Sequence, residues 1–206
     1  MGHVKRLLPF LVALSLIHPA SEIPPVYLDY FEQFGGDAAV SRGLRLLGYY
    51  GATFDLRICS FHDFLVPAGF LATLRACMRL RRRGLAWFAP PCSTWVWMSR
   101  SSTGRAERVT GNPENENVQA QNMLVRRLLH LLTLLIKRGC YFVIEQPGSS
   151  VMFNHPAVEK FKKRWERYIS QAKLQMGHWT LESQKDTILW GWVPSNWDIG
   201  ITIKAI

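Results

Sequence analysis

Short apolar segments alternate with amphipathic segments along most of this chain, and that alternation limits its fold more than any other feature. Strands that alternate with helices are typical of an α/β fold with a mostly parallel central sheet and helices on both faces. The polar stretch 99–116 predicts a long loop. The expected strands are 27–34, 51–56, 85–89, 140–144 and 187–192, and the expected helices are 38–47, 70–82, 118–137 and 157–173.

One of these strands, 85–89, ends at Pro90 and Pro91, and Cys92 follows at once. Proline fixes φ and has no N–H, so the pair ends the strand and stiffens the loop. In open α/β sheets, active sites lie outside the carboxyl ends of strands. Cys92 is therefore a candidate nucleophile held on a constrained backbone. A buried structural cysteine beside a proline turn is the alternative.

A pair of glycines connects the first expected strand to the first expected helix. Gly35 and Gly36 would let a ligand approach the backbone, and the helix N-terminus offers free N–H groups. Asp55 ends the next strand, where an acid accepts hydrogen bonds from ribose hydroxyls. Asp63 follows a third apolar stretch and could line the same cleft. The pattern predicts a nucleotide site, with an ordinary strand–turn–helix as the alternative.

Glu145 ends its expected strand much as Cys92 follows its own. Two adjacent parallel strands would bring both side chains to one rim of the sheet. A carboxylic acid beside a thiol makes a plausible acid and nucleophile pair. An acid solvated at a strand end is the alternative.

The charge of the chain favours a polyanionic partner. Lys and Arg number 25 against 15 Asp and Glu, a formal charge of +10, which favours nucleic acid first and an anionic membrane second. A generic basic protein is the alternative. None of the four cysteines lies in a Cys-x-x-Cys pair and no zinc spacing is present, so we expect no structural metal and reduced thiols. The tryptophans near 95 and 190 are expected in the core rather than as stacking surfaces for bases.

The N-terminal segment 1–25 differs from the rest of the chain. Lys5 and Arg6 precede the apolar run 7–17, which resembles a signal or targeting peptide and is too short to span a bilayer comfortably. A first core helix is the alternative. The chain is therefore divided into an extension, 1–25, and an α/β domain, 26–206. The compartment stays open, with the nucleus or an organelle expected for an enzyme acting on DNA.

The order of these motifs resembles the DNA (cytosine-5)-methyltransferase family over roughly residues 27–150. That family has an acidic-x-Phe-x-Gly loop, an acid that ends the second strand, a Pro-Pro-Cys nucleophile loop and a Glu-Asn-Val motif. The corresponding residues here are Glu32 to Gly36 with Phe34 between them, Asp55, Pro90 to Ser93, and Glu145 to Pro147.

The resemblance implies a Rossmann-like methyltransferase fold, S-adenosylmethionine as cofactor, and nucleic acid as substrate, with DNA favoured over RNA. It implies that the Cys92 thiolate attacks carbon 6 of cytosine while Glu145 holds and protonates ring nitrogen 3. The residues implied to bind the cofactor are Glu32, Phe34, Gly35, Gly36, Asp55, Asp63 and Pro90. Those that would contact nucleic acid are Ser93, Arg100 and Arg105.

The chain also departs from the family pattern. Glu145 is followed by Gln-Pro rather than Asn-Val, no clear Gln-x-Arg-x-Arg motif is present, and too few residues follow position 173 for a target-recognition domain. Two other functions therefore stay open. One is a catalytically inactive nucleic-acid-binding module, and the other is a Rossmann enzyme that uses a dinucleotide cofactor. The oligomeric state is not predicted.

Overall fold

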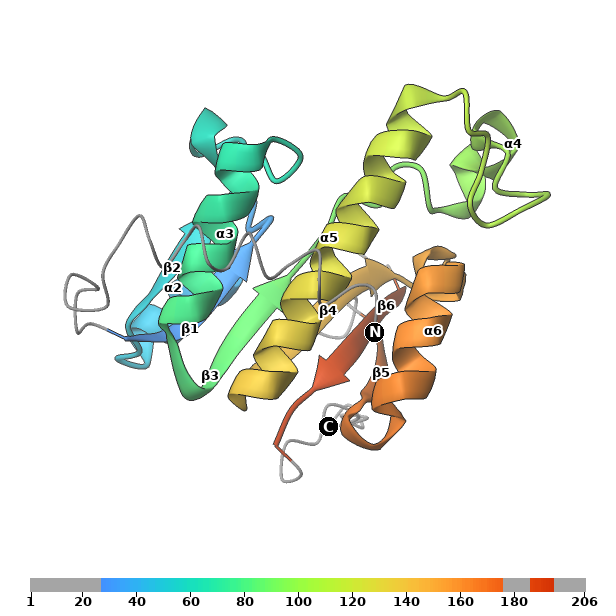
Figure 1. Ribbon diagram of the computed structural model, residues 1–206. Coiled ribbons are helices and arrows are strands. Elements are labelled where there is room, and N and C mark those ends of the chain that lie inside the picture. The colour runs from blue at the N-terminus through green and yellow to red at the C-terminus, as the bar shows by residue number, and fades with distance from the viewer. Residues whose placement is uncertain (1–26, 176–185, 195–206) are drawn as a thin grey trace.

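The computed structural model describes residues 27–175 and 186–194 (Figure 1). The extension 1–25, with its expected targeting peptide or core helix, lies outside the described residues. Within the described ranges, no helix is both long and apolar enough to cross a membrane.

Six strands form one sheet in the order β2-β1-β3-β4-β6-β5. The pairs β1–β2, β1–β3 and β3–β4 are parallel, whereas β6 runs antiparallel to both β4 and β5. The sheet is therefore mixed, and not parallel throughout. The strands are β1 (Leu28–Gln33), β2 (Gly51–Phe54), β3 (Leu80–Phe88), β4 (Tyr141–Pro147), β5 (Ser170–Gln175) and β6 (Asp186–Trp192).

Helices cover both faces of this sheet, as the alternation of segments predicts. Side chains alternate between the faces of a strand. In β1, Glu32 accepts a hydrogen bond from the backbone N–H of Ser41 in α2, whereas Gln33 accepts one from Thr73 in α3, so these two helices lie on opposite faces. The helices are α2 (Ala39–Leu46), α3 (Pro67–Arg79), α4 (Arg100–Thr103), α5 (Glu116–Arg138) and α6 (Pro156–Trp165), with short 3₁₀ turns at Ser60–His62, Trp97–Ser99, Met152–Asn154 and Glu166–Tyr168.

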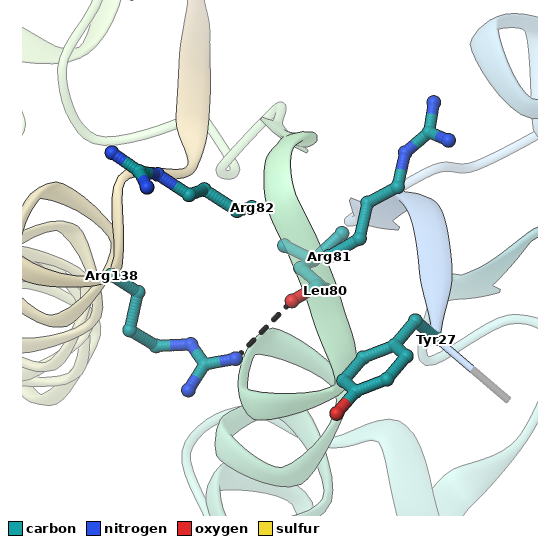
Figure 2. Close-up of a pocket in the computed structure, with 5 residues that line it drawn as sticks. All are labelled: Tyr27, Leu80, Arg81, Arg82 and Arg138. Carbon is teal, nitrogen blue, oxygen red and sulfur yellow. Dashed lines mark hydrogen bonds between the residues drawn. The ribbon is translucent and has the colours of Figure 1, made fainter. Parts of the chain in front are cut away.

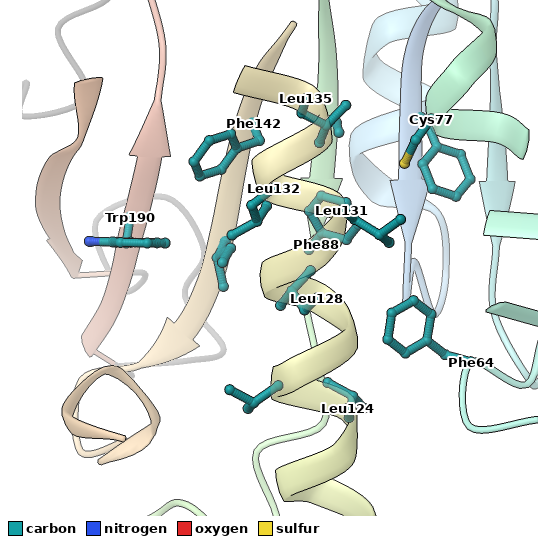
Figure 3. Close-up of a cluster of buried hydrophobic side chains, with 14 of the residues drawn as sticks. Phe64, Cys77, Phe88, Leu124, Leu128, Leu131, Leu132, Leu135, Phe142 and Trp190 are labelled. Atoms are coloured by element: carbon teal, nitrogen blue, oxygen red, sulfur yellow. The ribbon is translucent and has the colours of Figure 1, made fainter. Parts of the chain in front are cut away.

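The main core lies between α5 and the sheet. The side chain of Asn115 caps the start of α5 by accepting from the N–H of Val118, and Gly139 ends the helix in a left-handed conformation. Between these ends, leucines recur at helical spacing and pack on aromatic side chains of the strands (Figure 3). Each buried leucine contributes about 2 kcal/mol by removal of apolar surface from water. The side chains of this layer include Leu124, Leu128, Leu131, Leu132, Leu135, Phe88, Phe142 and Trp190.

Four segments differ from expectation. Residues 80–82, expected to end a helix, instead begin β3, because Leu80 pairs with Leu28 of β1. The helix expected over 157–173 ends at Trp165, and 170–175 is the edge strand β5, because its backbone pairs with β6. The strand expected over 140–144 continues to Pro147, because β6 pairs with it beyond the end of β3. The expected loop 99–116 contains the short helix α4.

Candidate active site

The strand order changes direction between β1 and β3. From β1 the chain continues outward to β2 on one side, and from β3 it continues outward to β4 on the other side. In open α/β sheets, ligands bind outside the carboxyl ends of the strands at such a point. The loops that follow β1, β2, β3 and β4 therefore share one edge of the sheet. Most of the predicted site residues lie in these loops or at the strand ends.

Cys92 and Glu145 line one pocket of about 190 Å³ at this edge. The pocket forms where β4 extends past its neighbour, since β3 pairs with β4 only as far as Ile144. The remaining lining residues are Ala89, Pro90, Gln146, Pro147 and Thr187. The structure thus brings together the predicted thiol and the predicted acid.

The environment of Glu145 favours its protonated form. Burial raises the pKa of this carboxyl above its ordinary value, a hydrogen bond from Trp87 lowers it, and the nearby charge of Glu32 raises it again. The net effect is a raised pKa. Glu145 therefore keeps its proton to a higher pH than an ordinary glutamate, as a proton donor requires.

Gln146 fixes the proline turn that precedes Cys92, and sequence analysis did not assign it this role. Its side-chain amide donates to the carbonyl of Pro90 at 2.6 Å, and its oxygen accepts from the hydroxyl of Ser150 at 2.8 Å. All of these groups are buried or nearly so. The signal in the sequence was present, because this glutamine is the residue that departs from the Glu-Asn-Val pattern.

Trp95 anchors the other side of the cysteine loop. Its backbone N–H donates to the carbonyl of Cys92 at 2.8 Å. Its ring is fully buried, which confirms that this tryptophan belongs to the core. The Arg105 guanidinium lies 3.3 Å from the ring centroid of Trp95. It also donates to the carbonyl of Val109 and to the side chains of Thr94 and Asn122.

The three residues expected to contact nucleic acid differ in exposure. Ser93 is exposed beside Cys92. Arg100 is half-buried and donates to the carbonyl of Ser149 at 2.6 Å. Arg105 is only 3% exposed, so in this structure it holds the loop together, and its burial does not favour the predicted phosphate contact.

The turn after β1 brings the predicted cofactor residues of β1 and β2 together. Phe34, Gly36 and Ala38 all have positive φ, which makes a compact turn into α2. The N–H of Gly36 donates to one oxygen of Asp55 at 2.8 Å, and the N–H of Arg57 donates to the other at 2.8 Å. Since a carboxylate has about four acceptor positions, Asp55 retains capacity for the hydroxyls of a ribose. This donor set fits the nucleoside part of the predicted cofactor.

Two other predicted cofactor residues accept hydrogen bonds from nearby backbone N–H groups. Glu32 is buried and accepts from the N–H of Ser41 in the first turn of α2 at 3.0 Å. Asp63 accepts from the N–H of Leu65 at 2.8 Å, just before α3. Gly35 lies so close to Thr53 that a β-carbon there would approach its methyl group to 2.5 Å. Contact of these residues with a cofactor stays a prediction.

No group of three or more potential metal ligands occurs among the residues that the structure describes.

Comparison with known proteins gives a fold neighbour and no family. No protein-family model matches the chain, and no curated protein matches it. Among solved structures, it is similar to the crystal structure of S. pombe Dnmt2 methyltransferase, with a TM-score of 0.46 and 13% identity. The match covers 85% of this chain and 52% of that one, so the chain spans about half the length of that structure. A likeness of this extent assigns no role to any residue.

Proposed function

We propose that this chain transfers a methyl group from S-adenosylmethionine to carbon 5 of cytosine in nucleic acid, through a covalent adduct on Cys92. The observation that supports the proposal most is the pocket that Cys92 shares with Glu145. The turn at Gly36 and the carboxylate of Asp55 lie at the ends of neighbouring strands on the same edge. A thiol, a carboxylic acid and the carboxylate of Asp55 therefore lie along one edge of the sheet.

Each side chain has a defined part in the reaction. The Cys92 thiolate forms a carbon–sulfur bond at carbon 6, while Glu145 gives its proton to ring nitrogen 3. Carbon 5 becomes electron-rich and takes the methyl group. A water molecule then takes the proton from carbon 5, and the electron pair of that bond re-forms the 5,6 double bond and expels the thiolate. Ring nitrogen 3 returns its proton to the carboxylate of Glu145, and S-adenosylhomocysteine is the leaving group of the methyl transfer. S-adenosylmethionine, held through the carboxylate of Asp55 beside the Gly35-Gly36 turn, would supply the electrophilic methyl carbon.

The size of the pocket limits what enters it. At about 190 Å³ it is smaller than the ~300 Å³ at the lower end of drug-sized ligand pockets. A single base fits this size better than a stacked pair. A base in a duplex would therefore have to leave the stack to reach Cys92.

A covalent trap tests the proposal. An oligonucleotide with 5-fluorocytosine cannot lose a proton from carbon 5, so after methyl transfer the carbon–sulfur bond persists. The full chain with S-adenosylmethionine should form this adduct, and peptide mass spectrometry should place it on Cys92. Cys92→Ser should lower the yield by roughly 10³-fold or more.

Cys59→Ser is the matched control, because Cys59 is also a half-buried free thiol but lies outside the pocket. It should form the adduct as the unaltered chain does. Absence of any adduct, together with binding of the same oligonucleotide, would favour the inactive binding module over the enzyme.

A further inference from the structure

Three consecutive arginines leave the regular sheet at the start of β3. Leu28 of β1 pairs with Leu80, but Tyr30 pairs with Leu85. Asp29 alone therefore lies opposite four residues, 81–84. This insertion is a large β-bulge on β3, at the end of the sheet opposite to the Cys92 pocket.

The bulge changes the direction of its side chains. In a regular strand, neighbouring side chains point to opposite faces, and one of the two faces here is packed with core residues. In the bulge, Arg81, Arg82 and Arg83 are all exposed. Bulges are known to redirect side chains in this way, often next to functional sites.

The bulge is fixed rather than loose. Arg83 has a φ of 63°, a conformation that non-glycine residues adopt only at an energetic cost. Its N–H donates to the carbonyl of Gly139 at 2.8 Å, which ties the bulge to the end of α5. A strained residue that is held in place so firmly suggests a use for the side chains around it.

Beside the bulge lies a cavity of about 310 Å³, lined by Tyr27, Leu80, Arg81, Arg82 and Arg138 (Figure 2). Arg138 donates to the carbonyls of Met78 and Leu80, and its Nε is buried without a hydrogen-bond partner. The cavity therefore has a rigid cationic wall.

Positive charges outnumber negative charges around this cavity. Arg81 is paired with Asp29 at 2.9 Å. Within the part of the chain that is described, Arg82, Arg83 and Arg138 form no ion pair. An anionic group near the bulge would meet several guanidinium groups and one carboxylate.

The chemistry of the surface favours a nucleic-acid backbone. Guanidinium groups present forked donors that match phosphate oxygens. Tyr27 is 64% exposed at the same cavity and offers a ring on which a base can stack. An anionic lipid surface would attract the same guanidinium groups, but it offers no base to stack on the exposed ring of Tyr27.

The geometry points to a second nucleic-acid contact at this bulge, in which Arg82, at the cavity that Tyr27 also lines, and the adjacent exposed Arg83 bind backbone phosphates. The inference takes its class of partner from the proposed function. The regular part of β3, 85–88, separates the two sites, and at ~3.3 Å per residue they lie on the order of 15–20 Å apart. Because helices cover both faces of the sheet between the two sites, a strand must pass around the outside of the molecule, so the bulge would hold backbone several nucleotides away from a base in the Cys92 pocket.

Binding measured without cofactor tests this inference. Fluorescence anisotropy of a labelled single-stranded oligonucleotide is recorded for the full chain over a range of salt concentrations. The double variant Arg82→Gln/Arg83→Gln should bind roughly 10-fold more weakly at low salt. Its plot of log affinity against log salt should be flatter by about 1.4, because each lost phosphate contact removes ~0.7 for single strands.

The control removes the same charge elsewhere. Lys163→Gln/Arg164→Gln lies on the exposed side of α6 and should leave the salt slope nearly unchanged. Equal slopes for the two double variants would overturn the inference. It would also be overturned if Arg82→Gln/Arg83→Gln lowered binding to phosphatidylserine vesicles but left binding to the oligonucleotide unchanged. Thermal melts of both variants exclude unfolding as the cause.

The proposed function fails separately. If the unaltered chain binds the oligonucleotide through the bulge but forms no adduct with 5-fluorocytosine, the proposed contact is supported and the proposed methyl transfer is wrong. If the adduct forms and the Arg82→Gln/Arg83→Gln variant binds normally, only the contact is wrong.

Discussion

The two loops that meet at the candidate active site are built in different ways. The turn after β1 is short, and its shape comes from three residues with positive φ and from hydrogen bonds to the adjacent strand β2. The segment after β3 is long, and it is held by side chains that arrive from distant parts of the chain. Gln146 reaches it from β4, and Arg105 crosses it to reach α5.

This difference separates what each loop depends on. The turn after β1 depends on the backbone freedom of a few positions, so a change there acts locally. The cysteine loop depends on a buried network in which one arginine serves several partners. Loss of that arginine leaves several polar groups unpaired at once, and such groups are costly when buried.

Removal of Arg105 should produce the largest effect on stability. Arg105→Ala takes away a ring contact with Trp95 and hydrogen bonds to Val109, Thr94 and Asn122. We expect a loss of about 3 kcal/mol in the free energy of unfolding, measured by urea denaturation. The yield of the Cys92 adduct should also fall, because the loop loses its anchor.

Arg108→Ala is the matched control in the same segment. Arg108 is exposed and its side chain donates to the carbonyl of Gly111, a bond to one surface group, so its removal should cost less than ~1 kcal/mol. If the two alanine variants are equally stable, the buried network does not hold the loop and the contrast between the two loops disappears.

A substitution in the turn after β1 should have a smaller effect. Gly36 has a φ of 53°, and a β-carbon there would lie 2.4 Å from the tip of Arg57. Gly36→Ala should cost about 1–2 kcal/mol from the backbone conformation, because the exposed Arg57 side chain can move aside. If this turn holds the cofactor, the rise in melting temperature on addition of S-adenosylmethionine should also shrink.

Gly43→Ala provides a control of opposite sign. Gly43 lies inside α2 with nothing within 4 Å of a new β-carbon, so alanine should stabilise the chain by roughly 0.5–1 kcal/mol. A Gly36→Ala variant as stable as the unaltered chain would show that the left-handed turn is not needed.

The same contrast explains what could be predicted from the sequence. Apolar runs predicted β1 and β2, and the two predicted site positions Gly36 and Asp55 lie within one hydrogen bond of each other, although that bond itself was not predicted. Burial of α5 followed equally from the periodicity of its leucines. These signals are local, since each depends on residues close together or on a regular repeat.

Features that depend on long-range pairing could not be predicted in this way. Residues 170–173 were expected to continue the charged helix that begins at 157, but pairing with β6 makes 170–175 a strand. Gln146 and Pro90 are 56 positions apart, and nothing in the local sequence of either indicates their hydrogen bond. Arg105 in a polar stretch resembled a phosphate contact, and only packing shows that it is buried.

The smallest expected effect concerns His155, which lies against Trp95 on the side of the cysteine loop. Burial, with the charges of Arg105 and Arg126, lowers the pKa of His155 to about 4. Its Nδ1 accepts from the N–H of Ala157, so it also caps α6. In the unfolded chain a histidine has a pKa near 6.5. Between about pH 6.5 and 4, the unfolded state therefore binds a proton that the folded state does not, and stability falls as the pH falls.

His155→Asn separates this titration from the cap, because asparagine also caps helices but does not titrate. Relative to pH 7.5, the unaltered chain at pH 5.8 should lose about 1 kcal/mol more unfolding free energy than the variant. Urea denaturation of both proteins at both pH values gives this difference, and the contributions of the carboxylates cancel in it. An equal loss in the two proteins would mean that His155 is accessible to protons in the folded state. The side chains around Trp95 and Arg105 would then not be packed tightly enough to exclude a proton. The cysteine loop would depend mainly on its own backbone, as the turn after β1 does.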